Sequence, residues 1–260
     1  MSLVPLVLSA SQVTETGVIG VVIGLLGGLF GKGGSAVATP LLRLIGLPGF
    51  VAVASPLPAT APSTLVAAGA YWKADFIDWK VVRWGIVIGI PATAAGALLS
   101  RFTGDGPLLI ATGLLVLGFG LSFLLRPTEE KNANGNGSTD ISYFRLRMVV
   151  ISIFVGIISG LLANSGGFLL APLYARFLKL HLKTAFACSL VVSAVLAIPG
   201  TAVHWYLGHI SWPVALIVAV GSVPFAYLGA RLAIRTNAGR LERIYGLALT
   251  VLGAFFVAHH

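Results

Sequence analysis

The stretch GLFGKGGSAVATP, from Gly28 to Pro40, has a second copy in the same chain, GLLANSGGFLLAP, from Gly160 to Pro172. The copies align without a gap, since 160 − 28 and 172 − 40 both give 132. Each copy lies in a long apolar stretch, carries several glycines and ends in proline, and both residue types interrupt helices. Paired helix breaks in corresponding halves of a membrane chain are typical of a transporter binding site. The repeat therefore predicts a site made by two broken helices.

Composition places this site in a membrane. Of 260 residues, 57% are hydrophobic and 10% charged, and the mean hydropathy is +0.96. Soluble domains have about 25% charged residues. Uncharged runs such as 107–125, 184–203 and 210–230 have the roughly 20 residues that a helix needs to cross hydrocarbon. Alternating ten-residue strands, typical of membrane barrels, are absent from the sequence. The expected fold is an all-α polytopic membrane protein.

The duplication extends beyond the glycine motif. At an offset of 133, Trp72 pairs with Trp205, Pro91 with Pro224, and Gly96 with Gly229. Each half has about five hydrophobic segments: 16–31, 34–45, 51–72, 82–100 and 107–125, then 148–163, 166–178, 184–206, 213–233 and 244–258. We expect a first membrane repeat over 1–126, a polar linker over 127–146 and a second repeat over 147–260, forming one transport domain with broken or re-entrant helices at the glycine motifs.

The positive charges predict how the halves are oriented. The net charge of +9 comes from Lys and Arg that lie mostly in short loops, and the loops near Lys73, Arg145, Lys179 and Arg240 fit the cytoplasm. This distribution favours membrane orientation over nucleic-acid binding. The loop after the first motif then lies outside and its counterpart inside. Five segments per half, an odd number, require inverted repeats, an arrangement that recurs in secondary transporters.

The charges near the breaks favour an anion as the ligand. Every Asp and Glu lies in a loop, the linker or a segment end. A cation carrier normally places a carboxylate within the membrane. Lys32 instead lies inside the first glycine break, where an uncompensated charge costs roughly 2.5–3.5 kcal/mol. Lys32 either binds the anion or extends its ammonium group to the cytoplasmic surface.

Backbone groups are also expected to contribute. A half-helix restarts after each break, so its free N–H groups point into the break and attract anions. Asn164 and Ser165 can donate hydrogen bonds, and His204, which ends a long apolar run, either takes part in the site or lies among interfacial aromatic residues. The predicted substrate-binding residues are Lys32, Gly33, Gly34, Ser35, Asn164, Ser165, Gly166, Gly167 and His204. For Gly24, Gly28, Gly156 and Gly160, close helix packing is the alternative role.

These motifs resemble the sulfite exporter TauE/SafE family. The resemblance rests on two glycine motifs ending in proline, each followed by an Ala/Ser-rich helix, an aromatic turn (AYWKADFIDW and VHWYLGHISW) and a helix with proline and glycine. It covers roughly residues 20–255 and implies transport of sulfite, sulfonates or related organic anions across the prokaryotic cytoplasmic membrane. Lys32 and the pair Asn164-Ser165 differ from the residues usual in that family.

The expected function is therefore a secondary transporter that works by alternating access, and the resemblance implies the export direction. A passive anion channel is one alternative, because no coupling carboxylate is visible. An intramembrane serine protease using Ser165 and His204 is a weaker one, because residue 163 is Ala and the corresponding positions of the first half lack both groups. We expect no enzyme activity, no cofactor, no metal and no nucleic acid. The expected partners are a small anion and membrane lipid, with a homodimer left open.

Overall fold

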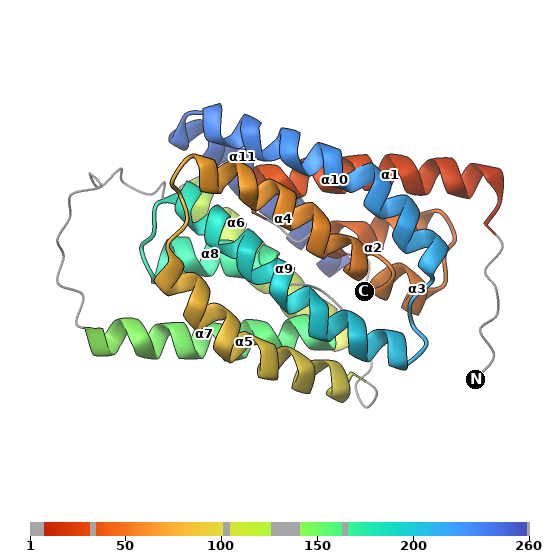
Figure 1. Ribbon diagram of the computed structural model, residues 1–260, viewed down its shortest axis with the longest axis horizontal. Helices are drawn as coiled ribbons and strands as arrows, with labels where there is room; N and C mark the ends of the chain where they lie inside the picture. Colours follow the sequence, from red (N-terminus) through yellow and green to blue (C-terminus); the bar gives the residue numbers. More distant parts are fainter. Residues whose placement is uncertain (1–7, 32–34, 101–104, 126–140, 163–165, 259–260) are drawn as a thin grey trace.

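The computed structural model describes residues 8–31, 35–100, 105–125, 141–162 and 166–258. Within them the chain forms eleven α-helices and no strand. The helices are α1 (Ala10–Phe30), α2 (Ser35–Leu44), α3 (Gly49–Ala54), α4 (Leu57–Lys73), α5 (Trp79–Leu99), α6 (Asp105–Leu125), α7 (Ile141–Leu161), α8 (Gly167–Phe177), α9 (Leu182–Tyr206), α10 (Trp212–Arg235) and α11 (Ala238–Ala258). Figure 1 shows the long helices lying side by side along the longest axis of the molecule.

Helix length and apolarity confirm the all-α polytopic membrane fold. In the described part of the chain, six spans are long and apolar enough to cross a membrane, two of them being Trp79–Leu99 and Leu182–Tyr206. α2 and α8, which follow the glycine motifs, have only 10 and 11 residues. At a rise of 1.5 Å per residue, each reaches about half of the hydrocarbon thickness.

Several boundaries differ from the expected segments; α1 and α11, for example, each begin six residues earlier. The segment 51–72 is divided into α3 and α4 at Ser55 and Pro56, because Pro56 and Pro58 lack the N–H groups that a continuous helix would use. Its counterpart in the second half, α9, is one helix. α7 begins at Ile141, so residues 141–146 of the expected linker are helical. The rest of the linker, 127–140, lies outside the described residues.

The helix pairs that pack together come in corresponding sets. α1 packs on α10, and its counterpart α7 packs on α5, the counterpart of α10. Likewise α4 packs on α10, and its counterpart α9 packs on α5. Two further pairs each join a helix to its own counterpart: α4 packs on α9, and α6 packs on α11. Exchanging the two halves of the chain therefore leaves this set of pairs unchanged.

Glycines make the closest of these contacts. A methyl group on Gly28 would overlap the carbonyl oxygen of Ala226, and one on Gly160 would overlap that of Thr93. Ala226 and Thr93 correspond at the offset of 133, as Gly28 and Gly160 do at 132. These glycines let two helix backbones touch, which confirms the packing role considered for them.

The first helices of the two halves run in opposite directions. α1 runs parallel to α10, since Gly20 meets Val218 and Gly28 meets Ala226. α10 in turn runs against α9, because Lys183 near the start of α9 donates a hydrogen bond to the carbonyl of Ile234 near the end of α10. α7 runs parallel to α5, since Gly156 meets Ala92 and Gly160 meets Ala97. α5 runs parallel to α9, since Gly85 meets Val192 and Gly89 meets Leu196.

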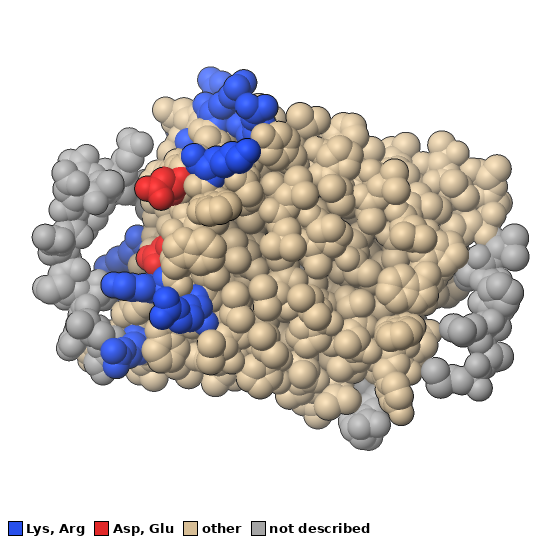
Figure 2. Space-filling view, viewed as in Figure 1, with Lys and Arg blue, Asp and Glu red and all other residues tan. Residues whose placement is uncertain are grey.

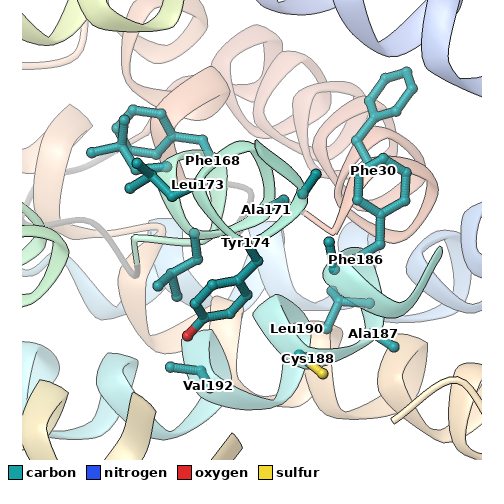
Figure 3. Close-up of a cluster of buried hydrophobic side chains, with 14 of the residues drawn as sticks. Phe30, Phe168, Ala171, Leu173, Tyr174, Phe186, Ala187, Cys188, Leu190 and Val192 are labelled. Carbon is teal, nitrogen blue, oxygen red and sulfur yellow. The ribbon is translucent and has the colours of Figure 1, made fainter. Parts of the chain in front are cut away.

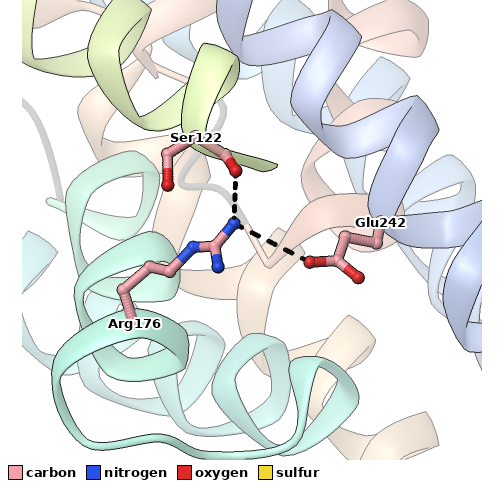
Figure 4. A network of polar contacts seen from close by, with 3 residues as sticks. All are labelled: Ser122, Arg176 and Glu242. Atoms are coloured by element: carbon pink, nitrogen blue, oxygen red, sulfur yellow. Dashed lines mark hydrogen bonds and ion pairs between the residues drawn. The ribbon is translucent and has the colours of Figure 1, made fainter. Parts of the chain in front are cut away.

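On the face shown in Figure 2, charged side chains gather at one end of the molecule. Figure 2 shows every Lys and Arg visible on that face at the end where α4 passes into α5 and α10 into α11. Figure 4 shows one contact at this end: Arg176 of α8 donates to the carbonyl of Ser122 on α6 at 2.7 Å and lies 3.9 Å from a carboxylate oxygen of Glu242 on α11. The end of the half-helix α8 is thus attached to two other helices.

The core surrounds α8. Residues 167–175 of α8 are all buried, and Figure 3 shows Tyr174 pointing toward Val192 of α9 and Phe168 and Leu173 on the other side of α8. Phe186 of α9 packs edge-on against Phe30 of α1, with ring centroids 6.5 Å apart. A hydrophobic core on all sides fixes this half-helix in the middle of the bundle.

Candidate functional site

The first glycine break begins where α1 ends. Gly31 caps α1 with φ of 64°, a left-handed conformation that suits glycine, and its N–H bonds to the carbonyl of Gly27. The carbonyl of Gly31 accepts a hydrogen bond of 2.8 Å from Ser189 of α9. Lys32, Gly33 and Gly34 lie outside the described residues. Ser35 is the first residue of α2, and its side chain is outside the description as well.

The second break ends where α8 begins. Gly166, with φ of 75°, is the N-cap of α8, and Gly167 is its first residue. Both are buried. Leu169 and Leu170 donate to the carbonyl of Gly166, whereas the helix itself supplies no acceptor for the N–H groups of Gly167 and Phe168. This buried turn therefore presents backbone donors and the positive end of the helix dipole. Asn164 and Ser165 lie outside the described residues.

His204 is buried and caps the helix before the second break. Its side chain is 3% exposed, unlike its neighbours Trp205 and Tyr206, which are 59% and 80% exposed. The His204 Nε2 lies 3.1 Å from the carbonyl oxygen of Gly160, in the last turn of α7. Carbonyls in the last turn of a helix lack a helical donor, and His204 supplies one.

The tautomer of His204 follows from these contacts. A carbonyl only accepts, so Nε2 carries the proton, and in the neutral ring Nδ1 is an acceptor. The Nδ1 of His209 lies 3.1 Å from the Nδ1 of His204 and donates to it. Both ring nitrogens of His204 are therefore engaged within the protein in this state.

Tyr71 caps α1 in the first half as His204 caps α7 in the second. The sequence did not lead us to Tyr71. Its hydroxyl donates to the carbonyl of Gly28 at 3.3 Å. Tyr71 corresponds to His204 at the offset of 133, and Gly28 corresponds to Gly160. The available signal was position: each residue directly precedes the paired tryptophan, Trp72 or Trp205.

A narrow pocket with hydroxyl side chains in its lining lies beside the first break, between α1, α4, α9 and α10. Its cavity volume is about 10 Å³, room for about one water molecule. We call it the first-half pocket. Its lining includes Gly24, Gly27, Gly28, Thr60, Ser63, Thr64, Leu190, Ser222 and Ala226.

The hydroxyl groups of this pocket use their protons within their own helices. Thr64 donates to the carbonyl of Thr60 at 2.7 Å, Ser63 to the same carbonyl at 3.1 Å, and Thr60 to that of Pro56 at 3.3 Å. Their oxygen lone pairs remain for a ligand. None of these side chains was singled out from the sequence, because Ser and Thr are common in apolar helices and only the fold brings α4 and α10 together.

The described part of the chain has no second candidate site built from acidic or metal-ligating side chains. No group of three or more His, Cys, Asp or Glu side chains gathers there in a way that could hold a metal ion. The buried acid Glu242 lies at the charged end beside Arg176. The polar features within the bundle are thus hydroxyls, an imidazole pair and helix ends.

A bundle of apolar spanning helices, with two short helices that follow glycine breaks and a polar pocket between the halves, defines a multi-pass membrane transporter. The chain belongs to the sulfite exporter TauE/SafE family, whose model matches residues 16–256. This match confirms the resemblance seen in the sequence. No solved structure matches the chain.

Curated relatives are named as transporters. The chain is 28% identical to a probable membrane transporter protein of Xylella fastidiosa (strain 9a5c), over 93% of this chain and 92% of the relative. It is 23% identical to one of Methanocaldococcus jannaschii, over 92% and 93%, and 23% identical to YjnA of Bacillus subtilis, over 90% and 96%. The family and these names indicate a membrane transporter rather than an enzyme.

Proposed function

We propose that the protein is a secondary transporter that exports small sulfur-containing or organic anions, such as sulfite or sulfonates, by alternating access between two inverted repeats. The observation that carries the proposal is the buried start of α8 at Gly166, where free N–H groups and the helix dipole meet inside a membrane bundle. The family name, sulfite exporter, supports the substrate class and direction.

The charge distribution supports the orientation. The Lys and Arg side chains on the face shown in Figure 2 lie at the end of the molecule that holds the α4–α5 and α10–α11 connections. The positive-inside rule assigns that end to the cytoplasm of a prokaryotic inner membrane. Lys32 directly follows Gly31, so its positive charge belongs to the first break. There it would attract an anion that binds between the two breaks.

Transport of sulfoacetate into proteoliposomes tests this proposal. The parent protein is expected to catalyse saturable counterflow, in which sulfoacetate loaded on one side drives uptake of labelled sulfoacetate from the other. Lys32→Ala should weaken binding by about 1.5–3 kcal/mol, Lys32→Arg should retain part of it, and Lys32→Glu should abolish it.

Three outcomes would contradict parts of the proposal. Flux without saturation or counterflow would indicate a passive channel. Unchanged transport by both Lys32→Ala and Lys32→Glu would place Lys32 at the surface and remove it from the site. A parent that moves or binds none of sulfite, sulfoacetate, acetate and sulfate would overturn the function.

A further inference from the structure

Several buried hydroxyl groups have no hydrogen-bond partner among the described residues. Three of them are Thr93 on α5, Ser159 on α7 and Ser193 on α9, each at most 1% exposed. A buried hydroxyl without a partner costs roughly 1–3 kcal/mol, so such groups call for a physical reason. Most Ser and Thr side chains in helices avoid the cost by donating to a carbonyl one turn earlier, as Thr64 does.

These three positions correspond to the lining of the first-half pocket. At the offset of 133, Ser193 corresponds to Thr60 and Thr93 to Ala226; at 132, Ser159 corresponds to Gly27. Thr60, Ala226 and Gly27 all line that one pocket. The glycine contacts show that the helix crossings correspond as well, since Gly28 meets Ala226 where Gly160 meets Thr93. The three hydroxyls thus belong to the second-half counterpart of the pocket.

Leu196 occupies this counterpart in the described state. It corresponds to Ser63 of the first-half pocket and packs on Gly89, the counterpart of Ser222. A leucine side chain here takes the space that two small hydroxyls leave open in the first half. The counterpart is therefore narrowed by a leucine side chain, where the first-half pocket has room for about one water molecule.

Ser159 also lies directly against the start of α8. A side chain at Gly166 would overlap the Ser159 Oγ, so the hydroxyl faces the N-cap of this helix. An unpartnered donor and the free N–H groups of the first turn thus meet at one buried place. Hydroxyl protons, amide protons and the positive end of the dipole all favour a negatively charged acceptor.

We propose that Ser159, Ser193 and Thr93, together with the first turn of α8, form an oxyanion subsite that receives a sulfonate or carboxylate group when the second half opens. The proposal rests on the proposed anion transport and assigns its second binding position. The first-half pocket presents mainly oxygen lone pairs, whereas this subsite presents protons. The anion is therefore held more tightly on the α8 side.

Binding of sulfoacetate to the purified full chain, by isothermal titration and by the ligand-induced shift in Tm, tests the subsite. Thr93→Val, Ser159→Ala and Ser193→Ala should each weaken binding about tenfold to a hundredfold, because each removes one donor to a charged acceptor. Thr93→Ser restores the hydroxyl and should bind within about threefold of the parent, a change under 1 kcal/mol.

Thr16→Val is the matched control. Thr16 on α1 is also fully buried and without a partner among the described residues, and it lies outside this subsite. If unpartnered hydroxyls are only a packing cost, Thr93→Val and Thr16→Val should both raise Tm and leave sulfoacetate affinity unchanged. That result, with the parent still binding, overturns the subsite and leaves the transport function intact. A parent that binds none of the anions overturns both.

Discussion

The first-half pocket and its second-half counterpart are made by the same helix crossings, yet their hydroxyl groups differ. In the first, Thr60, Ser63 and Thr64 donate to carbonyls of α4. In the second, Thr93 and Ser193 have no partner in the described structure. Corresponding backbones thus carry different hydrogen-bonding capacity. A duplicated fold can therefore keep corresponding helix crossings while the hydrogen-bonding state of the hydroxyl groups at those crossings differs between its halves.

The experiment with the largest expected effect is cysteine labelling, which tests whether the two halves are inverted in the membrane. Cysteines introduced at Arg43 and Lys179, after replacement of the buried Cys188 by alanine, should react with a membrane-impermeant maleimide from opposite sides. Arg43 is in the last turn of α2 and Lys179 follows α8. Labelling of both from the same side would remove the two-fold relation on which the comparison depends.

The next effect tests whether the two crossings are equally tight. Gly28→Ala and Gly160→Ala should each destabilise the folded protein by about 1–3 kcal/mol, because each methyl group overlaps a backbone carbonyl of the facing helix. Gly69→Ala on α4 is the control, since nothing lies within 4 Å of its added methyl group. Titration with SDS in mixed micelles measures the free energy of unfolding. A small effect at only one glycine would show that the crossings are not equivalent.

The smallest effect concerns the two helix caps. Tyr71→Phe should cost about 0.5–1.5 kcal/mol, because it removes the donor to Gly28. His204→Phe should cost more, because it also removes the partner of His209. Tyr206→Phe, at an exposed position, should leave stability unchanged. The same unfolding titration measures all three, and equal costs for Tyr71→Phe and Tyr206→Phe would remove Tyr71 from its capping role.

Much of the fold was accessible from the sequence because its signals are local or periodic. Apolar run length predicted the spanning helices, and glycine with proline predicted the breaks at Gly31 and Gly166. The division of α3 from α4 at Pro56 was missed, because prolines near the start of a helix are compatible with its first turn as well as with a break.

The candidate site was only partly accessible. Gly166 and Gly167 were placed at the start of α8, and His204 was marked by its position. Tyr71 was marked only by its position directly before the paired Trp72, and the hydroxyls of Thr60, Thr93 and Ser193 carried no distinctive pattern. Whether a Ser or Thr binds a ligand depends on which helix lies opposite and on whether its proton is already used, and neither property is local.

The sequence by itself determined that this protein is a duplicated, helical membrane protein with two glycine breaks, because hydrophobic length, repeat spacing and backbone-breaking residues act along the chain. Only the tertiary structure decided which faces meet: α1 on α10, α7 on α5, Tyr71 on Gly28 and His204 on Gly160. The physical reason is that hydrogen-bond satisfaction and close packing depend on groups brought together from distant parts of the chain.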